Sequence, residues 1–317
     1  MHASSPQTAE RKDCNQLGLD LRGEAGRFAY TGPLWDVHTH IFSVAAGRVF
    51  FEAAEAYGIE RVWTMTQLEN VDALQAAFGD RLEFIAVPNI AARDQPGTFT
   101  TDWQRRIEQF REKGARLCKF WAAPRSFDFH PGPWLSSPQR REAMKLAREL
   151  GMMFMTHVAD PDNWFATKYA DSSFYGQKRD HYVALERVLD EFDDVTWIAA
   201  HMGGWPENLA FLDELLDRHP NLYLDTSATK WMTRELSKHP AEFADFAARH
   251  RDRLLFGSDN VATDENADFD LFASRYWALR TLIETDYDGQ NPIVDPDLHM
   301  LDPSLPEKST AALRGAG

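Results

Sequence analysis

Eight short apolar segments, rich in β-branched and aromatic residues, recur along the chain, and segments with helical periodicity separate them. Their first residues lie 21 to 42 residues apart, a spacing typical of βα units that build a parallel sheet. A count of eight favours closure into a barrel over an open doubly wound sheet. The sequence therefore predicts an α/β fold, a (β/α)8 TIM barrel whose functional site lies at the C-terminal face of the strands. The expected strands are Leu34–His40, Arg61–Gln67, Leu82–Asn89, Ala115–Ala122, Met153–Ala159, Val195–Met202, Leu222–Ala228 and Arg253–Asn260.

The segments between these strands have the pattern of helices that pack against a barrel. Pro138–Leu150 places its apolar residues on one face and stops at Gly151, just before the fifth expected strand. Ala267–Thr285 repeats large apolar residues at steps of three and four. Two long connections, at residues 123–137 and 160–180, follow the fourth and fifth strands and are candidate substrate covers.

The length of the chain fits one domain. Barrels of this class often exceed 200 residues as a single unit, so 317 residues do not require a second domain. No Gly-x-Gly-x-x-Gly turn follows the first strand, which argues against a dinucleotide-binding fold. We expect an N-terminal arm at residues 1–33, the barrel at 34–290 and an irregular C-terminal tail at 291–317.

Composition narrows the partners and the compartment. The chain has 34 Lys and Arg against 49 Asp and Glu, a formal net charge of −15, which argues against nucleic acid or an anionic membrane as the main partner. Cys14 and Cys118 are too few for a disulfide framework, and the first 30 residues contain no apolar leader. We expect a cytoplasmic protein that acts on a small-molecule carboxylate or carbonyl substrate; a homo-oligomer stays open.

Polar side chains gather where the expected strands end. The first strand closes with Asp36-Val37-His38-Thr39-His40, and alternation places its aspartate and both histidines on one face. The fifth strand ends at His157, the sixth at His201 and the eighth at Asp259. A hydrogen-bonded pair of core histidines would explain the first motif, and an ordinary polar residue at the end of a strand would explain any one of the others. Convergence of four strands on one face instead predicts a site for a metal ion, since imidazole and carboxylate are ordinary metal ligands.

These motifs resemble the amidohydrolase superfamily, and within it the amidohydrolase-2 (amidohydrolase-related) branch, which includes aminocarboxymuconate-semialdehyde and γ-resorcylate decarboxylases. The resemblance implies one divalent metal ion, zinc first and manganese second, held by His38, His40, His157 and Asp259. It also implies that His201 acts as acid or base beside metal-bound water, with Asp259 assisting in proton transfer. The likeness spans about residues 34 to 260 and rests on Asp36-Val37-His38-Thr39-His40, Thr156-His157-Val158, Ala200-His201-Met202-Gly203-Gly204 and Phe256-Gly257-Ser258-Asp259.

The chemistry of these residue types fits the implied roles. Three neutral imidazoles and one carboxylate leave a divalent ion at net +1, which acidifies bound water. An unligated His201 has an ordinary pKa near ~6.5, suited to moving a proton at neutral pH. Asp36 is expected behind the ligands, as an acceptor that orients one of their imidazoles, or else as a further ligand.

Lys119 lies in the fourth strand and faces inward if Leu117 does. Three roles are open: it binds a substrate carboxylate, it is N-carboxylated and bridges two metal ions, or it pairs with a neighbouring acid. The predicted ligands already satisfy one ion, so we expect a single metal. Further candidate substrate-binding residues follow predicted strands or lie on the long loops, where aromatic walls with a few cations suit a planar carboxylate. They are Trp121, Arg125, Lys168 and Trp205.

The leading functional prediction is a metal-dependent hydrolase that attacks a C–O or C–N bond next to a carbonyl, as in an ester, lactone or amide of a small carboxylate. The alternative is a non-oxidative decarboxylase of an aromatic or unsaturated carboxylic acid with the same metal site. A catalytically silent barrel and a metal-free lactonase are weaker alternatives. A silent barrel has no chemical need for the four expected metal ligands and His201 together.

The end of the chain departs from the resembled family, whose barrels usually close with a helix after a short acidic stretch. Here Pro296–Gly317 shows little helical pattern. Two explanations are open: the sequence is shortened at this end, or the N-terminal arm covers the exposed edge of the barrel.

Overall fold

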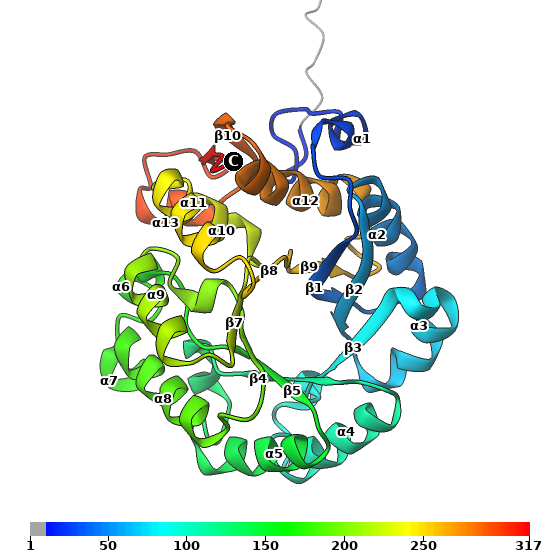
Figure 1. Ribbon diagram of the computed structural model, residues 1–317, viewed down its shortest axis with the longest axis vertical. Helices are drawn as coiled ribbons and strands as arrows, with labels where there is room; N and C mark the ends of the chain where they lie inside the picture. Colours follow the sequence, from blue (N-terminus) through cyan, green and yellow to red (C-terminus); the bar gives the residue numbers. More distant parts are fainter. Residues whose placement is uncertain (1–10) are drawn as a thin grey trace, which may run out of the picture.

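Parallel strands form the inner ring of the molecule, and helices surround it (Figure 1). The structure, a computed structural model, describes residues 11–317. The strands follow the order β8-β7-β6-β5-β4-β3-β2-β1-β9, so neighbours in sequence are neighbours in the sheet. The strands are β1 Leu34–Ile41, β2 Ile59–Met65, β3 Leu82–Ala86, β4 Leu117–Trp121, β5 Met153–His157, β6 Trp197–Ala199, β7 Leu222–Asp225, β8 Leu254–Leu255 and β9 Asn260–Ala262.

The eighth predicted strand closes the ring, and it does so in two pieces. β8 pairs with β7, whereas β9 pairs with β1. Between the two pieces, Val37 N donates to Phe256 O at 3.0 Å and Asp259 N donates to His38 O at 2.8 Å. These bonds continue the contact between the first and last strands. The predicted eight-stranded barrel is confirmed, with an interruption in its last strand.

The interior of the barrel is filled by one side chain from each of five consecutive strands. Met65, Ile85, Leu117, Met155 and Ile198 form this layer. Residues two positions further along a strand share its face, so Lys119 follows Leu117 into the interior. Cys118 and Phe120 belong instead to the larger apolar cluster between the sheet and the helices.

The outer helices bury their apolar faces against the sheet. The long helix α12 packs against α2 and α10, beside the strands that close the ring (Figure 1). Both helices expected from periodicity are present, as α5 and α12, with ends within two residues of the prediction. The helices that follow the strands are α2 Val44–Ala56, α3 Val71–Phe78, α4 Thr101–Glu112, α5 Pro138–Glu149, α8 Lys178–Glu191, α9 Leu209–Arg218, α10 Thr229–Leu236, α11 Pro240–Arg249 and α12 Phe269–Glu284.

Both ends of the described chain are structured and pack on this closing helix. The segment from residue 291, expected to be irregular, instead forms most of an antiparallel pair of strands, β10 Asp288–Val294 and β11 Thr310–Arg314, with α13 Pro296–Leu301 between them. The N-terminal arm, which includes α1 Leu21–Glu24, runs beside β10: Gln16 N donates to Pro292 O, and Val294 N donates to Asp13 O, both at 2.8 Å. Pairing between distant segments, which local periodicity does not encode, orders this region.

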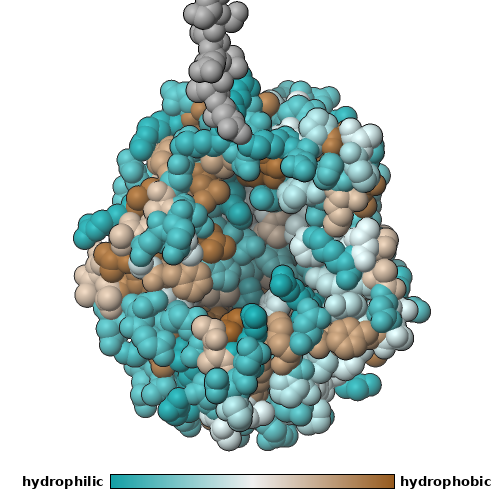
Figure 2. All heavy atoms as spheres, turned by 180° about the vertical axis from the view of Figure 1, so that it is seen from behind, coloured by the Kyte–Doolittle hydropathy of each residue, from teal (hydrophilic) through white to brown (hydrophobic). Residues whose placement is uncertain are grey.

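The side of the molecule opposite to Figure 1 is hollowed near its centre and mostly hydrophilic around the hollow (Figure 2). Short helices α6 Asp162–Ala166 and α7 Ser172–Tyr175 lie in the long connection after β5. Within residues 11–317, no helix combines the length and apolar character that a membrane crossing requires. Cys14 and Cys118 are buried and unpaired.

The pairing of β10 with β11 predicts that the last strand contributes to stability. Leu313 is fully buried, so Leu313→Ala should lower the free energy of unfolding by about 2–5 kcal/mol through lost burial and the cavity left behind. Leu305→Ala is the matched control, because this leucine is 39% exposed and should change the value by less than about 0.5 kcal/mol. Urea unfolding followed by circular dichroism measures both. Equal stability of the two variants would show that the C-terminal strand is not part of the core.

Candidate metal centre

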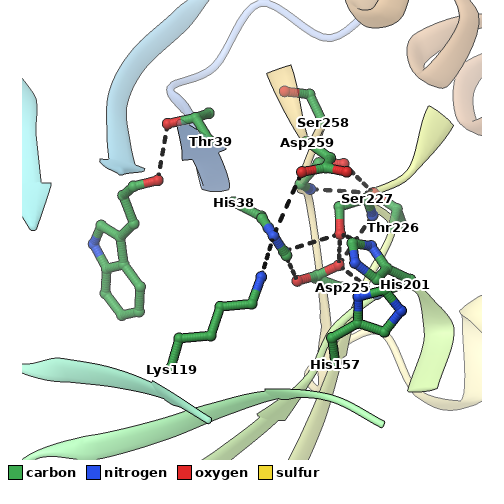
Figure 3. Close-up of polar contacts among 12 residues, drawn as sticks. His38, Thr39, Lys119, His157, His201, Asp225, Thr226, Ser227, Ser258 and Asp259 are labelled. Atoms are coloured by element: carbon green, nitrogen blue, oxygen red, sulfur yellow. Dashed lines mark hydrogen bonds and ion pairs between the residues drawn. The ribbon is translucent and has the colours of Figure 1, made fainter. Parts of the chain in front are cut away.

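His38 is the central side chain of the site, and a buried carboxylate fixes its ring. Its Nδ1 lies 2.8 Å from Asp225 Oδ2 at the end of β7, and both side chains are fully buried (Figure 3). The carboxylate accepts the Nδ1 proton, so the lone pair of His38 is on Nε2. The ring is therefore held in the tautomer that a metal ligand requires.

Three possible metal-binding atoms lie together where the first and last strands of the barrel meet. Two belong to β1 and one to the residue just before β9. His40 Nε2 is 3.2 Å from Asp259 Oδ1, and His38 Nε2 is 3.7 Å from the same oxygen. All three atoms lie within 4.8 Å of one another. Nitrogen and oxygen ligands about 2.0–2.2 Å from one ion are separated by such distances. Burial raises the pKa of Asp259, but the hydrogen bond from His40 and the nearby imidazoles outweigh it and keep the carboxylate ionised. This set fits a divalent cation.

Lys119 points from β4 into this set, as predicted. Its Nζ lies 2.7 Å from His38 Nε2, and the side chain is buried (Figure 3). Burial lowers the pKa of Lys119 to about 8, although the carboxylates of Asp259 and Asp225 oppose the shift. The hydrogen-bond partner of Lys119 is thus an imidazole, not a neighbouring acid. The lysine lies on the same side of His38 as the Nε2 lone pair, where it can meet a ligand carboxylate beside the metal position.

His157 lies near the site, but it does not belong to the donor set of His38, His40 and Asp259. Its Nδ1 accepts a hydrogen bond from Trp121 Nε1 at 3.1 Å, and its Nε2 lies 2.9 Å from Asp160 Oδ1. Since Nδ1 is the acceptor, Nε2 carries the proton that Asp160 receives. No lone pair of His157 is free in this arrangement. Its role as fourth ligand, implied by the resemblance, stays a prediction and requires the ring to give up one of these partners.

His201 lies next to two of the other histidines, with its ring centroid 4.3 Å from that of His157 in an edge-to-face contact and 4.9 Å from that of His38 in a tilted one. Its Nδ1 lies 2.7 Å from Ser227 Oγ, whose own proton goes to Asp225. The serine oxygen therefore accepts from Nδ1, and the lone pair of His201 is on Nε2. Burial, and then the nearby imidazoles, hold the pKa of His201 well below its ordinary value. The expected unperturbed pKa was wrong, because His201 is almost fully enclosed.

Asp225 performs the task that the sequence assigned to Asp36. Besides His38, it accepts from the backbone N–H of His201 at 2.9 Å and of Ser227 at 3.0 Å. A carboxylate at the end of the seventh strand, in Leu222-Tyr223-Leu224-Asp225, follows the same rule as His157 and Asp259. Its place at the end of a strand could have identified Asp225 from the sequence, but the sequence-based prediction did not include it.

Asp36 does not contact an imidazole. It accepts from the backbone N–H of His38 at 3.1 Å, and from Ser258 Oγ at 2.5 Å and Tyr276 Oη at 3.0 Å. The pairing of β1 with β2 shifts register between Asp36 and Thr39, so simple alternation does not hold here. Burial raises the pKa of Asp36 to about 7. This carboxyl group anchors the backbone of β1 to the last strand and to α12.

Unusual backbone conformations concentrate at the site. In residues 11–317, four residues other than glycine have positive φ: His201 at 60°, Met202 at 51°, Ala228 at 66° and Asp259 at 56°. His201, Ala228 and Asp259 line one cavity of about 470 Å³, and Met202 directly follows His201. L-residues adopt this conformation at a cost that the surrounding structure must offset, and such residues cluster at functional sites.

A cavity of about 470 Å³ lies over these side chains. Among the predicted residues, His40, Lys119, Trp121, His157, His201 and Asp259 line it. The rest of the wall is largely apolar, with Trp164 and Trp231 as further aromatic members. It is otherwise completed by Met65, Val87, Pro88, Ile90, Asp160, Ala228 and Val261.

Three predicted substrate-binding residues lie outside this wall. Trp205 stacks on Tyr182 with ring centroids 5.2 Å apart, as part of the apolar core. Lys168 lies over the ring of Trp164 and pairs with Asp297 at 3.3 Å. Arg125 is exposed. Positions after a strand were taken as site-facing, but the connections turn these side chains toward the core or solvent.

Solved structures with this architecture include metal-bound decarboxylases. A dihydroxybenzoic acid decarboxylase from Polaromonas sp. JS666, with manganese and the inhibitor 2-nitroresorcinol, has a TM-score of 0.50 and 14% identity over 78% of this chain and 90% of its own. A 2,6-dihydroxybenzoate decarboxylase from Rhizobium gives 0.48 and 14% over 78% and 91%. A 5-carboxyvanillate decarboxylase from Novosphingobium aromaticivorans, with manganese, gives 0.46 and 12% over 78% and 90%. At this identity, the first of them shows a shared fold.

The family is shown by sequence. No curated protein matches the chain. The family model described as amidohydrolase matches residues 44–297, which is most of the barrel together with α12 and β10. The resemblance drawn from the strand-end motifs is thereby confirmed, and the chain belongs to the amidohydrolase family.

Proposed function

We propose that this chain is a metal-dependent decarboxylase that releases CO2 from a small aromatic carboxylic acid without oxidation. The observation that carries the proposal is the cavity itself. Aromatic and aliphatic side chains form most of its wall, and Lys119, His40 and Asp259 lie on that wall. The buried Nε2 of His38 lies 2.7 Å from Lys119 Nζ and belongs to the same donor set as His40 and Asp259. Such a pocket suits a flat ring with one carboxylate. The decarboxylases of similar fold support this choice over hydrolysis, which the sequence favoured.

The metal would be held by His38, His40 and Asp259. Binding would require Lys119 to leave His38 Nε2, and His40 Nε2 to lose the proton that it donates to Asp259. His157 would be the fourth ligand once it leaves Trp121 or Asp160. Manganese and zinc both accept this mixture of imidazole and carboxylate. When bound, a divalent ion supplies a Lewis acid that holds the carboxylate region of the substrate and stabilises negative charge there.

Lys119 and Trp121 position the substrate. The ammonium group of Lys119 pairs with the substrate carboxylate, and the indole of Trp121 forms one wall for the ring. The apolar wall keeps water away from the carbon that loses its carboxyl group. Exclusion of water strengthens each of these electrostatic contacts.

The reaction breaks the bond between the ring and the carboxyl carbon and leaves its electron pair on the ring carbon, while CO2 departs. A proton must then form the new C–H bond. His201 is the proposed proton carrier, because it lines the cavity, is neutral and has its Nε2 lone pair available. It passes a proton from water to the ring carbon, and the hydroxide left from that water combines with the departing CO2 as bicarbonate. Asp259 lies nearby and balances the positive charge that His201 carries between the two transfers.

Hydrolysis of an ester, lactone or amide remains the second candidate, favoured by the same neutral His201 beside the metal position. In that case His201 would remove a proton from attacking water. A panel of lactones, amides and hydroxylated aromatic acids, with CO2 release followed for each, separates the two. Carbonyl-bond cleavage without CO2 release would overturn the decarboxylase proposal.

Metal content tests the donor set. Wild-type protein purified without a His-tag should carry near-stoichiometric manganese or zinc by elemental analysis. His38→Ala should weaken binding by more than about 100-fold, since loss of a ligand exceeds the 10–100-fold typical of a group behind a ligand. His239→Ala, at an exposed histidine outside the cavity, is the control and should keep its metal. Unchanged metal content in His38→Ala would exclude the proposed site.

Asp225→Asn tests the carboxylate behind His38. An amide can no longer accept both the Nδ1 proton and the backbone N–H groups as a charged group does, so manganese affinity should fall by about 10–100-fold. Titration of metal-free protein with manganese measures the change. Affinity equal to that of wild type would mean that the ring of His38 is oriented without Asp225.

His201→Asn tests proton transfer. Because the variant keeps a polar side chain of smaller size, it should bind manganese as wild type does while kcat falls by about 10²- to 10⁴-fold. Turnover of a substrate found in the panel, followed by CO2 release, gives the rate. Turnover at the wild-type rate would remove His201 from the mechanism.

A further inference from the structure

A buried cation without a counter-ion lies next to the active-site cavity. Arg140, in the first turn of α5, is only 5% exposed. Its Nε donates to Gly132 O at 3.0 Å, but its Nη2 is buried with no hydrogen-bond partner. None of the ion pairs found within residues 11–317 involves this arginine. Burial lowers the pKa of Arg140 to about 9, and no acidic group opposes the shift. A buried charge of this kind is costly unless something pairs with it.

Arg140 lines a small cavity that adjoins the large one. The small cavity measures about 20 Å³, room for roughly one water-sized group. Lys119, Trp121, Pro88 and Ile90 line both cavities. A substrate held in the large cavity therefore touches the same side chains that wall the small one. The remaining lining residues are Phe99, Trp103, Phe120 and His130.

The polar groups around the small cavity are donors. His130 Nδ1 accepts from Gly132 N at 2.9 Å, so a neutral ring carries its proton on Nε2. Burial, and then the charge of Arg140, lower the pKa of His130 to about 2, which keeps the ring neutral. With Lys119 as a second cation and no acid among the lining residues, the cavity is built to receive an acceptor of negative charge.

We propose that Arg140 binds a second carboxylate of the substrate, so that the enzyme selects aromatic dicarboxylic acids over monocarboxylic ones. One carboxylate oxygen enters the small cavity and accepts from Arg140 Nη2. The rest of that group and the ring occupy the large cavity, where the reacting carboxylate lies at Lys119 and the donor set. This inference rests on the proposed function for the identity of the reacting group. Arg140 is a specificity-determining residue and takes no part in bond cleavage.

Binding of two matched probes tests the subsite without turnover. Benzoate has one carboxylate, and isophthalate has a second one in the meta position. Isothermal titration of the manganese-loaded protein should show isophthalate bound about 10–100-fold more tightly than benzoate, the contribution expected from a hydrogen bond to a charged group. Arg140→Met removes the charge at similar length, so it should abolish this preference and leave benzoate affinity within about twofold.

Arg141→Met is the matched control, because this neighbour on α5 pairs with Glu191 at 2.5 Å outside both cavities and should keep the preference. Arg140→Lys retains a cation and should keep part of it. Thermal melting of each variant shows whether it folds. The comparison of the two probes on wild-type protein tests the proposal even if a variant does not fold.

Three results would overturn the proposal: wild-type protein binds both probes equally, Arg140→Met weakens both equally, or a crystal structure with isophthalate shows only water or chloride beside Nη2. Failure of the proposed function gives a different result. Isophthalates that bind through Arg140 but release no CO2 would leave the subsite standing and remove decarboxylation.

Discussion

The site depends on one buried carboxylate, Asp225, which joins the first strand of the barrel to the ends of the sixth and seventh strands. It accepts from His38 on β1, from the backbone after β6 at His201, and from Ser227 just past its own strand. Burial alone raises the pKa of Asp225, but the charge and hydrogen bond of His38, together with its other partners, hold it well below the ordinary value. A buried carboxylate is tolerated when both of its oxygens accept hydrogen bonds in this way. Asp225 fixes the tautomer of His38 directly and that of His201 through Ser227 Oγ, so the lone pairs of both imidazoles are on Nε2.

Closure of the barrel completes the site. The last strand breaks between β8 and β9, and the break is where Asp259 takes a left-handed conformation and comes beside His40. Asp36 ties the same region down, since it holds the backbone of His38 and of Ser258 across the closure. The backbone strain at Asp259 and the position of its carboxylate thus have one cause: the last strand pairs on both sides and still turns this carboxylate toward the first strand.

The C-terminal segment supports the wall of the cavity from outside. Asp297, on α13, accepts from Trp164 Nε1 at 2.7 Å and from Lys168, and it pairs with Arg234 of α10 at 3.2 Å. Trp164 lines the cavity, so the segment expected to be an irregular tail holds one of the rings of the cavity wall. Lys168 consequently pairs with Asp297 and does not line the cavity. Lys119 lines both the large and the small cavity, and Arg140 lines the small one.

The sequence by itself determined the repeat of strand and helix, the inward direction of Lys119 and the polar residues at the strand ends. These features follow from local rules, since strand alternation and helical periodicity act over a few residues. Tertiary structure alone decided which of those residues meet. In the folded chain, His157 bonds to Trp121 and Asp160, and His38 bonds to Asp225. Arg140 is buried with no acidic partner. Such outcomes depend on register shifts, closure and burial across distant segments, which no local pattern records.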